Sequence, residues 1–225
     1  MQSVIVEIRA AEGGDDAKLL VEDQLRIYNK FCSLNGYWLK ILSIRQGYVS
    51  TKITGENIVE VFKNEAGGHR WQRIPPNEKR GRIQTSTITV AVLEEISNVK
   101  TTIPENDIII TISRGSGNGG QHRNVTDSAV QIKHLPTGII VRIESERSQY
   151  QNKQLALEIL QQKINHLYNS NINNELNNKR KNQLGSGMRG DKIRTIRVKD
   201  DVVINHINGK RISFKKYSQG LINLF

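Results

Sequence analysis

Residues 107–124 read Asp-Ile-Ile-Ile-Thr-Ile-Ser-Arg-Gly-Ser-Gly-Asn-Gly-Gly-Gln-His-Arg-Asn, and this stretch decides the fold. Its first part, 107–113, is dominated by β-branched residues, which favour a strand. In the remainder, 114–124, four of the eleven positions are glycine, so there is little side chain to pack. The sequence therefore predicts a buried strand that runs directly into an exposed, glycine-rich loop.

The residues that follow this loop predict the rest of a small domain. Residues 130–134 and 139–143 are expected to form a hairpin. A long helix is expected from residue 149 to about residue 180, with apolar side chains at helical spacing along one face. That apolar stripe consists of Leu157, Leu160, Ile164 and Leu167.

The residues before the loop predict a second, larger unit. Its expected strands are 4–8, 38–44, 58–62 and 85–93. A helix is expected to begin near Asp15, where acidic groups suit the positive end of the helix dipole, and to end at Gly36. Residues 67–84 are basic and rich in turn formers, which predicts an exposed loop. Short strands are expected in the tail near 194–199, 202–207 and 210–214.

Charge gives the first indication of a partner. The 225 residues contain 33 Lys and Arg against 22 Asp and Glu, so the net charge is +11. Such a surplus is typical of proteins that bind a polyanion, although a basic surface kept for solubility is an alternative. Aromatic residues make up only 5%, so phosphate contact with a folded RNA fits better than base stacking.

Other classes of protein are disfavoured by composition. No apolar run approaches the roughly 18 residues that a membrane span needs, and the charged start does not resemble a signal peptide. The single cysteine, Cys32, excludes an intramolecular disulfide and a cysteine-rich metal site. We therefore expect a cytoplasmic or organellar-matrix protein without a membrane partner.

The chemistry of residues 114–124 leaves several interpretations open. Backbone N–H groups of the loop could hold phosphate, but neither a P-loop ending nor the acidic partner of a dinucleotide-binding fingerprint is present. A hydrolase triad of Ser116, His122 and Asp127 would crowd all three groups onto one loop, without a nucleophile elbow. A purely structural loop is a further alternative.

The most specific interpretation comes from a resemblance that covers nearly the whole chain. Residues 113–141, continued by Glu146-Arg147-Ser148-Gln149-x-x-Asn152-Lys153, resemble the catalytic domain of class I bacterial-type peptide chain release factors. The codon-reading domain of that family is resembled by Arg9-Ala10-x-x-Gly13-Gly14-Asp15-Asp16-Ala17, Gly67-Gly68-His69-Arg70-x-Gln72-Arg73-Ile74-Pro75 and Gly81-Arg82-Ile83-x-Thr85-Ser86. Its switch loop and returning strands are resembled by Leu184-Gly185-Ser186-Gly187 and Ile193-Arg194-Thr195.

The resemblance implies ribosome-dependent hydrolysis of peptidyl-tRNA, with Gly119, Gly120 and Gln121 as the catalytic residues. The two glycines would let the N–H of Gln121 point at the developing oxyanion, while its side chain helps to place water. Gln121 is also the position expected to be N5-methylated, by a glutamine methyltransferase. No cofactor or metal is implied, and the protein is expected to act as a monomer on rRNA, peptidyl-tRNA and mRNA. The expected rRNA contacts are Arg114, His122, Arg123, Asn124, Arg70, Arg73 and Arg82.

Two departures from the family pattern bear on specificity. Full-length members carry an additional N-terminal helical domain, whereas this chain begins close to the codon-reading domain. The Pro-x-Thr motif of one family branch is replaced by Pro75-Pro76-Asn77, and a nearby histidine is replaced by Gln84. Asn77 retains hydrogen-bonding groups, but Gln84 cannot stack as an imidazole does. The expected codon-recognition residues are Gln72, Pro75, Pro76, Asn77, Gln84, Thr85, Gly13 and Asp16.

Termination at a stop codon is therefore the expected function, with codon-independent rescue of stalled or damaged ribosomes as the alternative. A non-catalytic rRNA-binding assembly factor is a second alternative, against which the intact Gly-Gly-Gln tripeptide argues. The expected fold is α+β with two domains. A mixed-sheet codon-reading domain comprises residues 1–101 and is completed by C-terminal strands in 191–225. A smaller β-α-β-type catalytic domain comprises residues 102–190, so both junctions are expected to be hinges.

Overall fold

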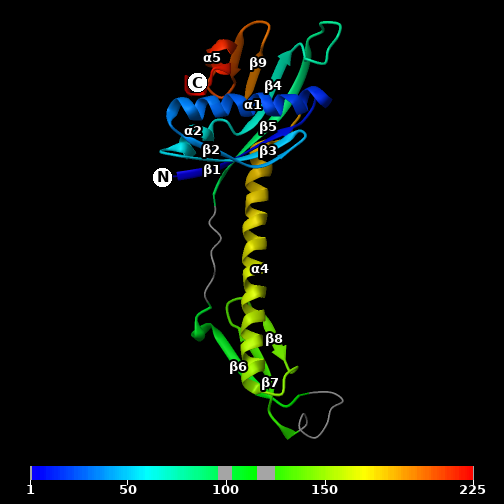
Figure 1. The fold of residues 1–225 in the computed structure, drawn as a ribbon, viewed down its shortest axis with the longest axis vertical. Helices are drawn as coiled ribbons and strands as arrows, with labels where there is room; N and C mark the ends of the chain where they lie inside the picture. Colours follow the sequence, from blue (N-terminus) through cyan, green and yellow to red (C-terminus); the bar gives the residue numbers. More distant parts are fainter. Residues whose placement is uncertain (1, 96–102, 116–124, 225) are drawn as a thin grey trace. The chain divides into compact units, whose positions relative to one another are not determined.

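The chain divides into two compact units in the computed structural model, which describes residues 2–95, 103–115 and 125–224 (Figure 1). The first unit comprises Met1–Ile96 and Leu176–Phe225, and the second comprises Ser97–Glu175. The expected junctions at 101 and 190 are thus displaced. The second junction falls earlier in the chain than expected, because the end of the long helix contacts the sheet of the first unit.

A mixed eight-stranded sheet forms the first unit, in the order β11-β10-β9-β4-β5-β1-β3-β2. All neighbours are antiparallel except β4 and β9, which are parallel. The C-terminal strands complete this sheet, as the sequence predicted. The strands are β1 (Gln2–Ala10), β2 (Trp38–Arg45), β3 (Tyr48–Gly55), β4 (Gly67–Arg73), β5 (Gln84–Glu94), β9 (Arg194–Arg197), β10 (Val202–Asn205) and β11 (Arg211–Ile212).

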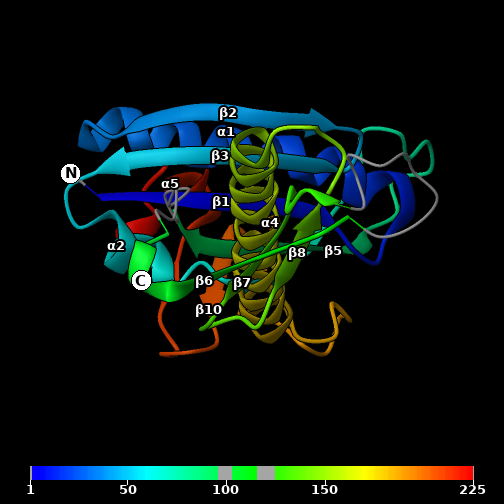
Figure 2. The ribbon, with the colours of Figure 1, turned by 90° about the horizontal axis from the view of Figure 1, so that it is seen from below.

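Helix α1 (Gly14–Asn35) lies along one face of this sheet (Figures 1 and 2). Its buried side chains recur at helical spacing and include Leu20, Ile27 and Phe31. The helix ends where the sequence predicted, because Gly36 adopts a left-handed conformation with φ of +69°. The shorter helices are α2 (Ile58–Lys63), α5 (Phe214–Ser218) and the 3-10 turn η2 (Ile222–Leu224).

Two expectations for the first unit were wrong, and one strand was missed. Residues 58–62 form helix α2 instead of a strand, since a short apolar run does not distinguish the two. Strand β3 was not expected, because its serine and threonine side chains obscure the apolar pattern. Residues 67–73 form the central strand β4 instead of an exposed loop, and only 74–83 connect β4 to β5.

Glycines at the start of β4 explain the last of these errors. A Cβ atom at Gly68 would lie 2.3 Å from the carbonyl oxygen of Asp191. Gly68 also accepts a hydrogen bond from the N–H of Ile193 at 2.9 Å. The glycine therefore marks a close approach of two backbones in a sheet, not a turn.

A buried ion pair joins the C-terminal strands to the rest of the first unit. Arg194 of β9 and Glu65, which precedes β4, are 1% and 2% exposed, and the guanidinium donates to the carboxylate. Glu65 also accepts a hydrogen bond from the hydroxyl of Tyr28 at 2.9 Å. Burial opposes the charged form of Arg194, but the adjacent Glu65 raises its pKa above the usual range. The amide of Gln24 extends the network by donating to the hydroxyl of Tyr217 at 2.9 Å.

The second unit contains three antiparallel strands, ordered β6-β7-β8, and most of helix α4 (Gln149–Leu184). The strands are β6 (Ile108–Ser113), β7 (Ala129–His134) and β8 (Ile140–Ile143), preceded by the 3-10 turn η1 (Glu105–Asp107). The expected hairpin is confirmed in β7 and β8. A β-α-β type was expected. The described elements are three antiparallel strands followed by α4, with residues 116–124 outside the description.

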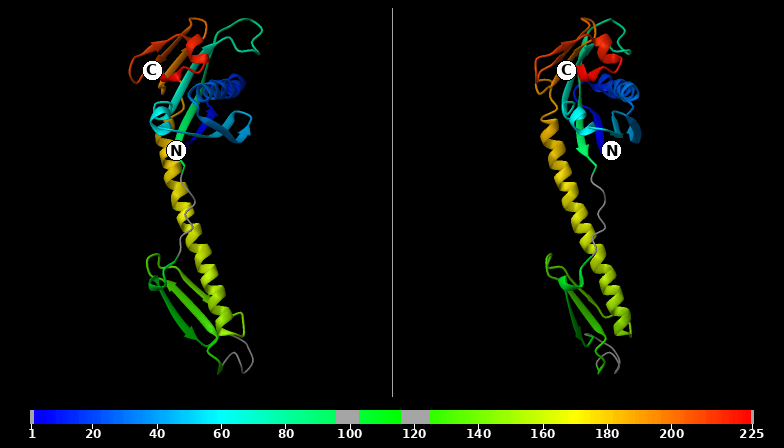
Figure 3. Two further views of the ribbon diagram at one scale, coloured as in Figure 1. Left: turned by 60° about the vertical axis from the view of Figure 1, so that its left-hand side comes forward. Right: turned by 90° about the vertical axis from the view of Figure 1, so that its left-hand side faces the viewer.

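Helix α4 packs on one face of the small sheet (Figure 3). Leu160 and Ile164 are buried there, as the predicted stripe required, whereas Leu157 is only partly buried. Strand β6 is less buried than expected, because Ile109 and Ile112 are about half exposed. None of the helices in the described part of the chain is long and apolar enough to cross a membrane.

We expect Glu65→Ala to destabilise the first unit by about 3–5 kcal/mol, because it leaves Arg194 buried without its carboxylate. Urea unfolding followed by tryptophan fluorescence reports on this unit, since both tryptophans of the chain, Trp38 and Trp71, lie in it. The control is Glu56→Ala, at an exposed turn position, which should change stability by less than about 0.5 kcal/mol. Equal midpoints for the two variants would contradict the role of the pair.

Candidate nucleic-acid interface

The predicted catalytic residues lie outside the described residues. Residues 116–124 are not described, and they include Gly119, Gly120 and Gln121. The predicted rRNA contacts His122, Arg123 and Asn124 belong to the same range. The residues on either side are described, and they bring the two ends of the segment together. Ser113 at the end of β6 pairs with Ala129 at the start of β7. The end of β6 and the start of β7 therefore lie side by side at the same end of the small sheet.

Arg114 lies at the first end of this loop and is 66% exposed. Its guanidinium forms an ion pair with Asp127 at 3.6 Å, and its carbonyl accepts a hydrogen bond from Arg142 at 3.4 Å. An exposed ion pair of this length contributes little, so Arg114 is accessible to a polyanion. Asp127, considered above as a triad member, pairs with this arginine, while Ser116 and His122 are not described.

Asn152 fixes the other end, and no role had been predicted for it. The side chain is fully buried, and its amide nitrogen donates to the carbonyls of Ser128 and Glu146 at 2.8 and 2.9 Å. Its amide oxygen accepts from the N–H of Glu146 at 3.0 Å. The signal in the sequence is a polar residue on the buried face of an otherwise apolar stripe. Asn152 holds the return of the loop against the start of α4.

A second group of predicted residues comes together where β4 and β5 end and α1 begins. Gln72 pairs with Thr85 in the β4–β5 ladder. The N–H of Thr87 donates to the carbonyl of Glu12 at 2.6 Å, which holds the turn before α1 against β5. Gly13 has a φ of +132°, and a Cβ there would lie 2.5 Å from that of Ser86. The fold thus joins the start of α1 to the ends of β4 and β5.

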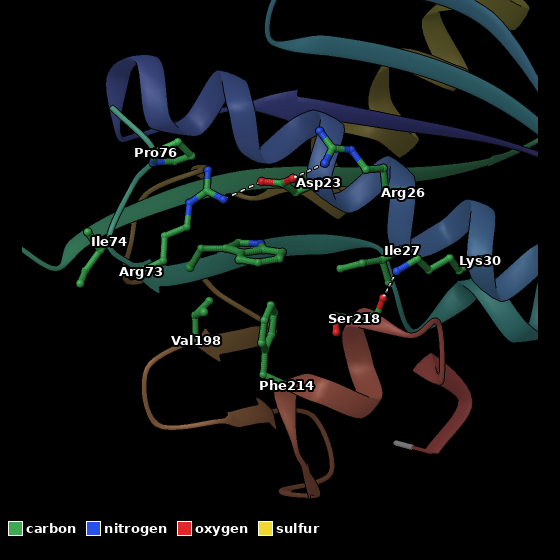
Figure 4. Close-up of a pocket in the computed structure, with 11 residues that line it drawn as sticks. Asp23, Arg26, Ile27, Lys30, Arg73, Ile74, Pro76, Val198, Phe214 and Ser218 are labelled. Carbon is green, nitrogen blue, oxygen red and sulfur yellow. Dashed lines mark hydrogen bonds and ion pairs between the residues drawn. The ribbon is translucent and has the colours of Figure 1, made fainter. Parts of the chain in front are cut away.

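Arg73 and Asp16 are placed differently from the prediction. The guanidinium of Arg73 lies 2.7 Å from Asp16 and 2.6 Å from Asp23, and the arginine side chain is only 11% exposed. The Asp16 side chain is 1% exposed. Arg73 was expected to contact rRNA, and Asp16 the codon. Instead their charges are directed at each other and attach α1 to the end of β4. Figure 4 shows the second contact of this arginine, with Asp23 of the same helix.

The loop between β4 and β5, residues 74–83, carries the remaining recognition residues and is called the recognition loop here. Pro75 is buried, whereas Pro76 and Asn77 are exposed. Gln84 is exposed at the start of β5, and its amide donates to Glu78 at 3.0 Å. Hydrogen bonds from the backbone of Arg80 and from Gln84 lower the pKa of Glu78.

The predicted arginine contacts of this unit differ in exposure. Arg82 is 67% exposed and only loosely paired with Glu78 at 3.6 Å. Arg70 is partly buried, and burial together with Arg197 lowers its pKa. Of the three arginines proposed for rRNA on this unit, Arg82 is therefore the most available and Arg73 the least.

A pocket of about 320 Å³ adjoins the recognition loop (Figure 4). Its floor is aromatic and aliphatic, with the rings of Trp71 and Phe214 in edge contact at 5.9 Å. Charged side chains of α1 form its rim, and Pro76 and Arg73 contribute to its wall. The pocket was not foreseen from the sequence, since its lining comes from α1, β4 and the C-terminal tail.

The loop that follows α4 contacts the turn before helix α1. Gly185 ends the helix in a left-handed conformation with φ of +57°. The N–H of Ser186 donates to the carboxylate of Asp191 at 2.7 Å. The N–H of Arg189 donates to the carboxylate of Glu12 at 2.9 Å. This contact places the loop beside the turn that carries Gly13.

Comparison with known proteins identifies the family of the chain. Residues 1–90 match the PCRF domain, and residues 95–207 match the RF-1 domain. The chain belongs to the peptide chain release factor family. Peptide chain release factor 1 of Thermotoga maritima is 42% identical over 219 residues, which cover 95% of this chain and 63% of the relative. That of Aquifex aeolicus is 43% identical over 211 residues, covering 91% and 58%.

A solved release factor has a similar structure. RF2 of Thermus thermophilus matches with a TM-score of 0.56 and 31% sequence identity, covering 99% of this chain and 66% of the other. The chain therefore spans less than two thirds of the length of these release factors.

We expect Asp16→Ala to destabilise the first unit by about 1–3 kcal/mol, because a buried charged group loses a hydrogen-bonding partner. It should also speed tryptic cleavage at Lys79 and Arg80, since the end of β4 is no longer held to α1. The matched control is Asp15→Ala, whose side chain is 75% exposed and pairs only with Lys18 on the surface. If the two neighbouring variants behave alike in unfolding and proteolysis, the Asp16–Arg73 contact does not position the loop.

Proposed function

We propose that this protein promotes hydrolysis of the ester of peptidyl-tRNA on the ribosome when a stop codon is present. The observation that carries the proposal is the intact Gly119-Gly120-Gln121 tripeptide within the stretch that matches the RF-1 domain. The paired ends of β6 and β7, with Asn152 behind them, support it, because they give that segment a fixed base. On this proposal the protein acts as a ribosome-dependent peptidyl-tRNA hydrolase.

On this proposal the two units would have different roles, one in hydrolysis and the other in contact with the mRNA. The second unit would carry Gln121, whose backbone N–H would stabilise the oxyanion and whose side chain would help to place water. The first unit would meet the mRNA with the recognition loop, using Gln72, Asn77 and Thr85, the uncharged groups suited to base edges. The net charge of +11 supports rRNA as the surface that both units bind.

Codon-independent rescue of stalled or damaged ribosomes is the second candidate. Two substitutions in the family pattern favour it, namely Asn77 in place of threonine and Gln84 in place of histidine. Both positions are exposed at the recognition loop, where they could sense an empty decoding site. Methylation of Gln121 by a glutamine methyltransferase and a cytoplasmic location belong to either candidate. An rRNA-binding assembly factor would share the RNA contacts and lack hydrolysis.

We expect Gly120→Ala to reduce peptide release at least a hundredfold, because one lost oxyanion donor costs about that much or more. Ribosome affinity should stay within a few fold, since phosphate contacts dominate binding. Release of labelled formyl-methionine and ribosome co-sedimentation measure the two properties. Gly138→Asn is the control, because this turn glycine of the same unit has φ of +70°, which asparagine tolerates, and open space around it.

Normal release by Gly120→Ala would refute the oxyanion role. Equal loss of binding and release would show that the loop serves attachment and not chemistry. No release by the unmodified protein on any ribosome, together with intact binding, would favour the assembly factor.

A further inference from the structure

Glu78 is an acidic side chain that faces inward in a loop whose other residues, apart from Pro75, are exposed. Its neighbours Asn77, Lys79 and Arg80 are all exposed. The Glu78 side chain, in contrast, retains only 7% of its exposed surface. Glutamate is seldom enclosed in this way unless it is paired.

Three groups of the same segment surround the Glu78 carboxylate. The backbone N–H of Arg80 donates to Oε1 at 2.7 Å, and the amide of Gln84 donates to Oε2 at 3.0 Å. The guanidinium of Arg82 lies 3.6 Å from Oε2. The N–H of Glu78 itself donates to the carbonyl of Pro75 at 3.0 Å. One residue thus connects the beginning, the middle and the end of the recognition loop.

This arrangement changes the part that Gln84 can play. Its amide nitrogen is bound to Glu78, so it is not available to a base without breaking that contact. Asn77 precedes Glu78 directly and has an exposed side chain. The geometry therefore separates a group that faces outward from a group that supports the loop.

We propose that Glu78 is a positioning residue that holds Gln84 and the Arg80 backbone so that the recognition loop presents Asn77 in one fixed shape. Gln84 is then a support of the loop and not a reader of bases. The inference rests on the proposed function in taking mRNA in the decoding site as what the loop meets.

A loop that is ordered before binding loses less conformational entropy when it binds. Loss of the Glu78 contacts should therefore raise the protein concentration needed for half-maximal release. The maximal rate should not change, because Glu78 lies in the first unit and the Gly-Gly-Gln tripeptide in the second. A general loss of folding would instead lower the unfolding midpoint, which should stay constant.

A double-mutant cycle tests this coupling directly. Glu78→Ala and Gln84→Ala should each raise the half-saturating concentration about tenfold, as expected for a lost charged hydrogen bond. The double variant should be no worse than Glu78→Ala, because that variant has already lost the contact with Gln84. An independent base-reading role for Gln84 would make the effects multiply to about a hundredfold, which would overturn the proposal. Glu56→Ala serves as the control.

A second measurement keeps the proposal testable if the unmodified protein releases no peptide. Amide hydrogen exchange in the free protein should show protection of the Arg80 N–H that disappears in Glu78→Ala and persists in Glu56→Ala. Equal exchange of the Arg80 amide in all three proteins would overturn the inference, whatever the outcome for peptide release. If no peptide is released but the Arg80 amide is protected as expected, the proposed function is refuted while the positioning role of Glu78 is supported.

Discussion

The first unit depends on the buried contact between Glu65 and Arg194. The chain leaves this unit at residue 96 and returns at residue 176, so its C-terminal strands must be joined to the sheet without continuity in sequence. The ion pair does this where β9 runs parallel to β4, and the hydroxyl of Tyr28 donates to the same carboxylate oxygen of Glu65 as Arg194 does. Burial of both charges requires such pairing, because an isolated buried charge is strongly unfavourable.

The candidate interface follows from the placement of β4. Strand β4 is fixed between β9 and β5 and ends in Arg73, whose contacts with Asp16 and Asp23 attach the start of α1. The recognition loop begins directly after this residue, and Glu78 connects its parts. The second unit uses the same principle on a smaller scale, since Asn152 holds the base of the loop that carries Gln121. In both units a buried polar side chain that is paired or hydrogen-bonded supports a loop that is proposed to meet RNA.

Local signals in the sequence predicted much of this arrangement, and long-range contacts account for what it missed. Gly36 ended α1, and the β7–β8 hairpin followed from its alternation and turn. Gly68 of β4 was misinterpreted as part of a turn, because it is required by the close backbone of Asp191, far along the chain. Arg73 was assigned to RNA because its partner Asp16 is 57 positions away and no local pattern joins them. Motifs thus pointed to the candidate site, while the fold decided which of its charged side chains are exposed and which are paired.

Peptide release by this protein is proposed to depend on a stop codon, and a release assay on programmed ribosomes tests this dependence. Ribosomes carrying labelled formyl-methionyl-tRNA would be programmed with each stop codon, with a sense codon, or with an empty decoding site, and release would be followed over time. We expect release on at least one stop codon to exceed clearly that on the sense codon and the empty site. Equal release in all cases, release confined to the empty site, or no release at all would contradict the claim.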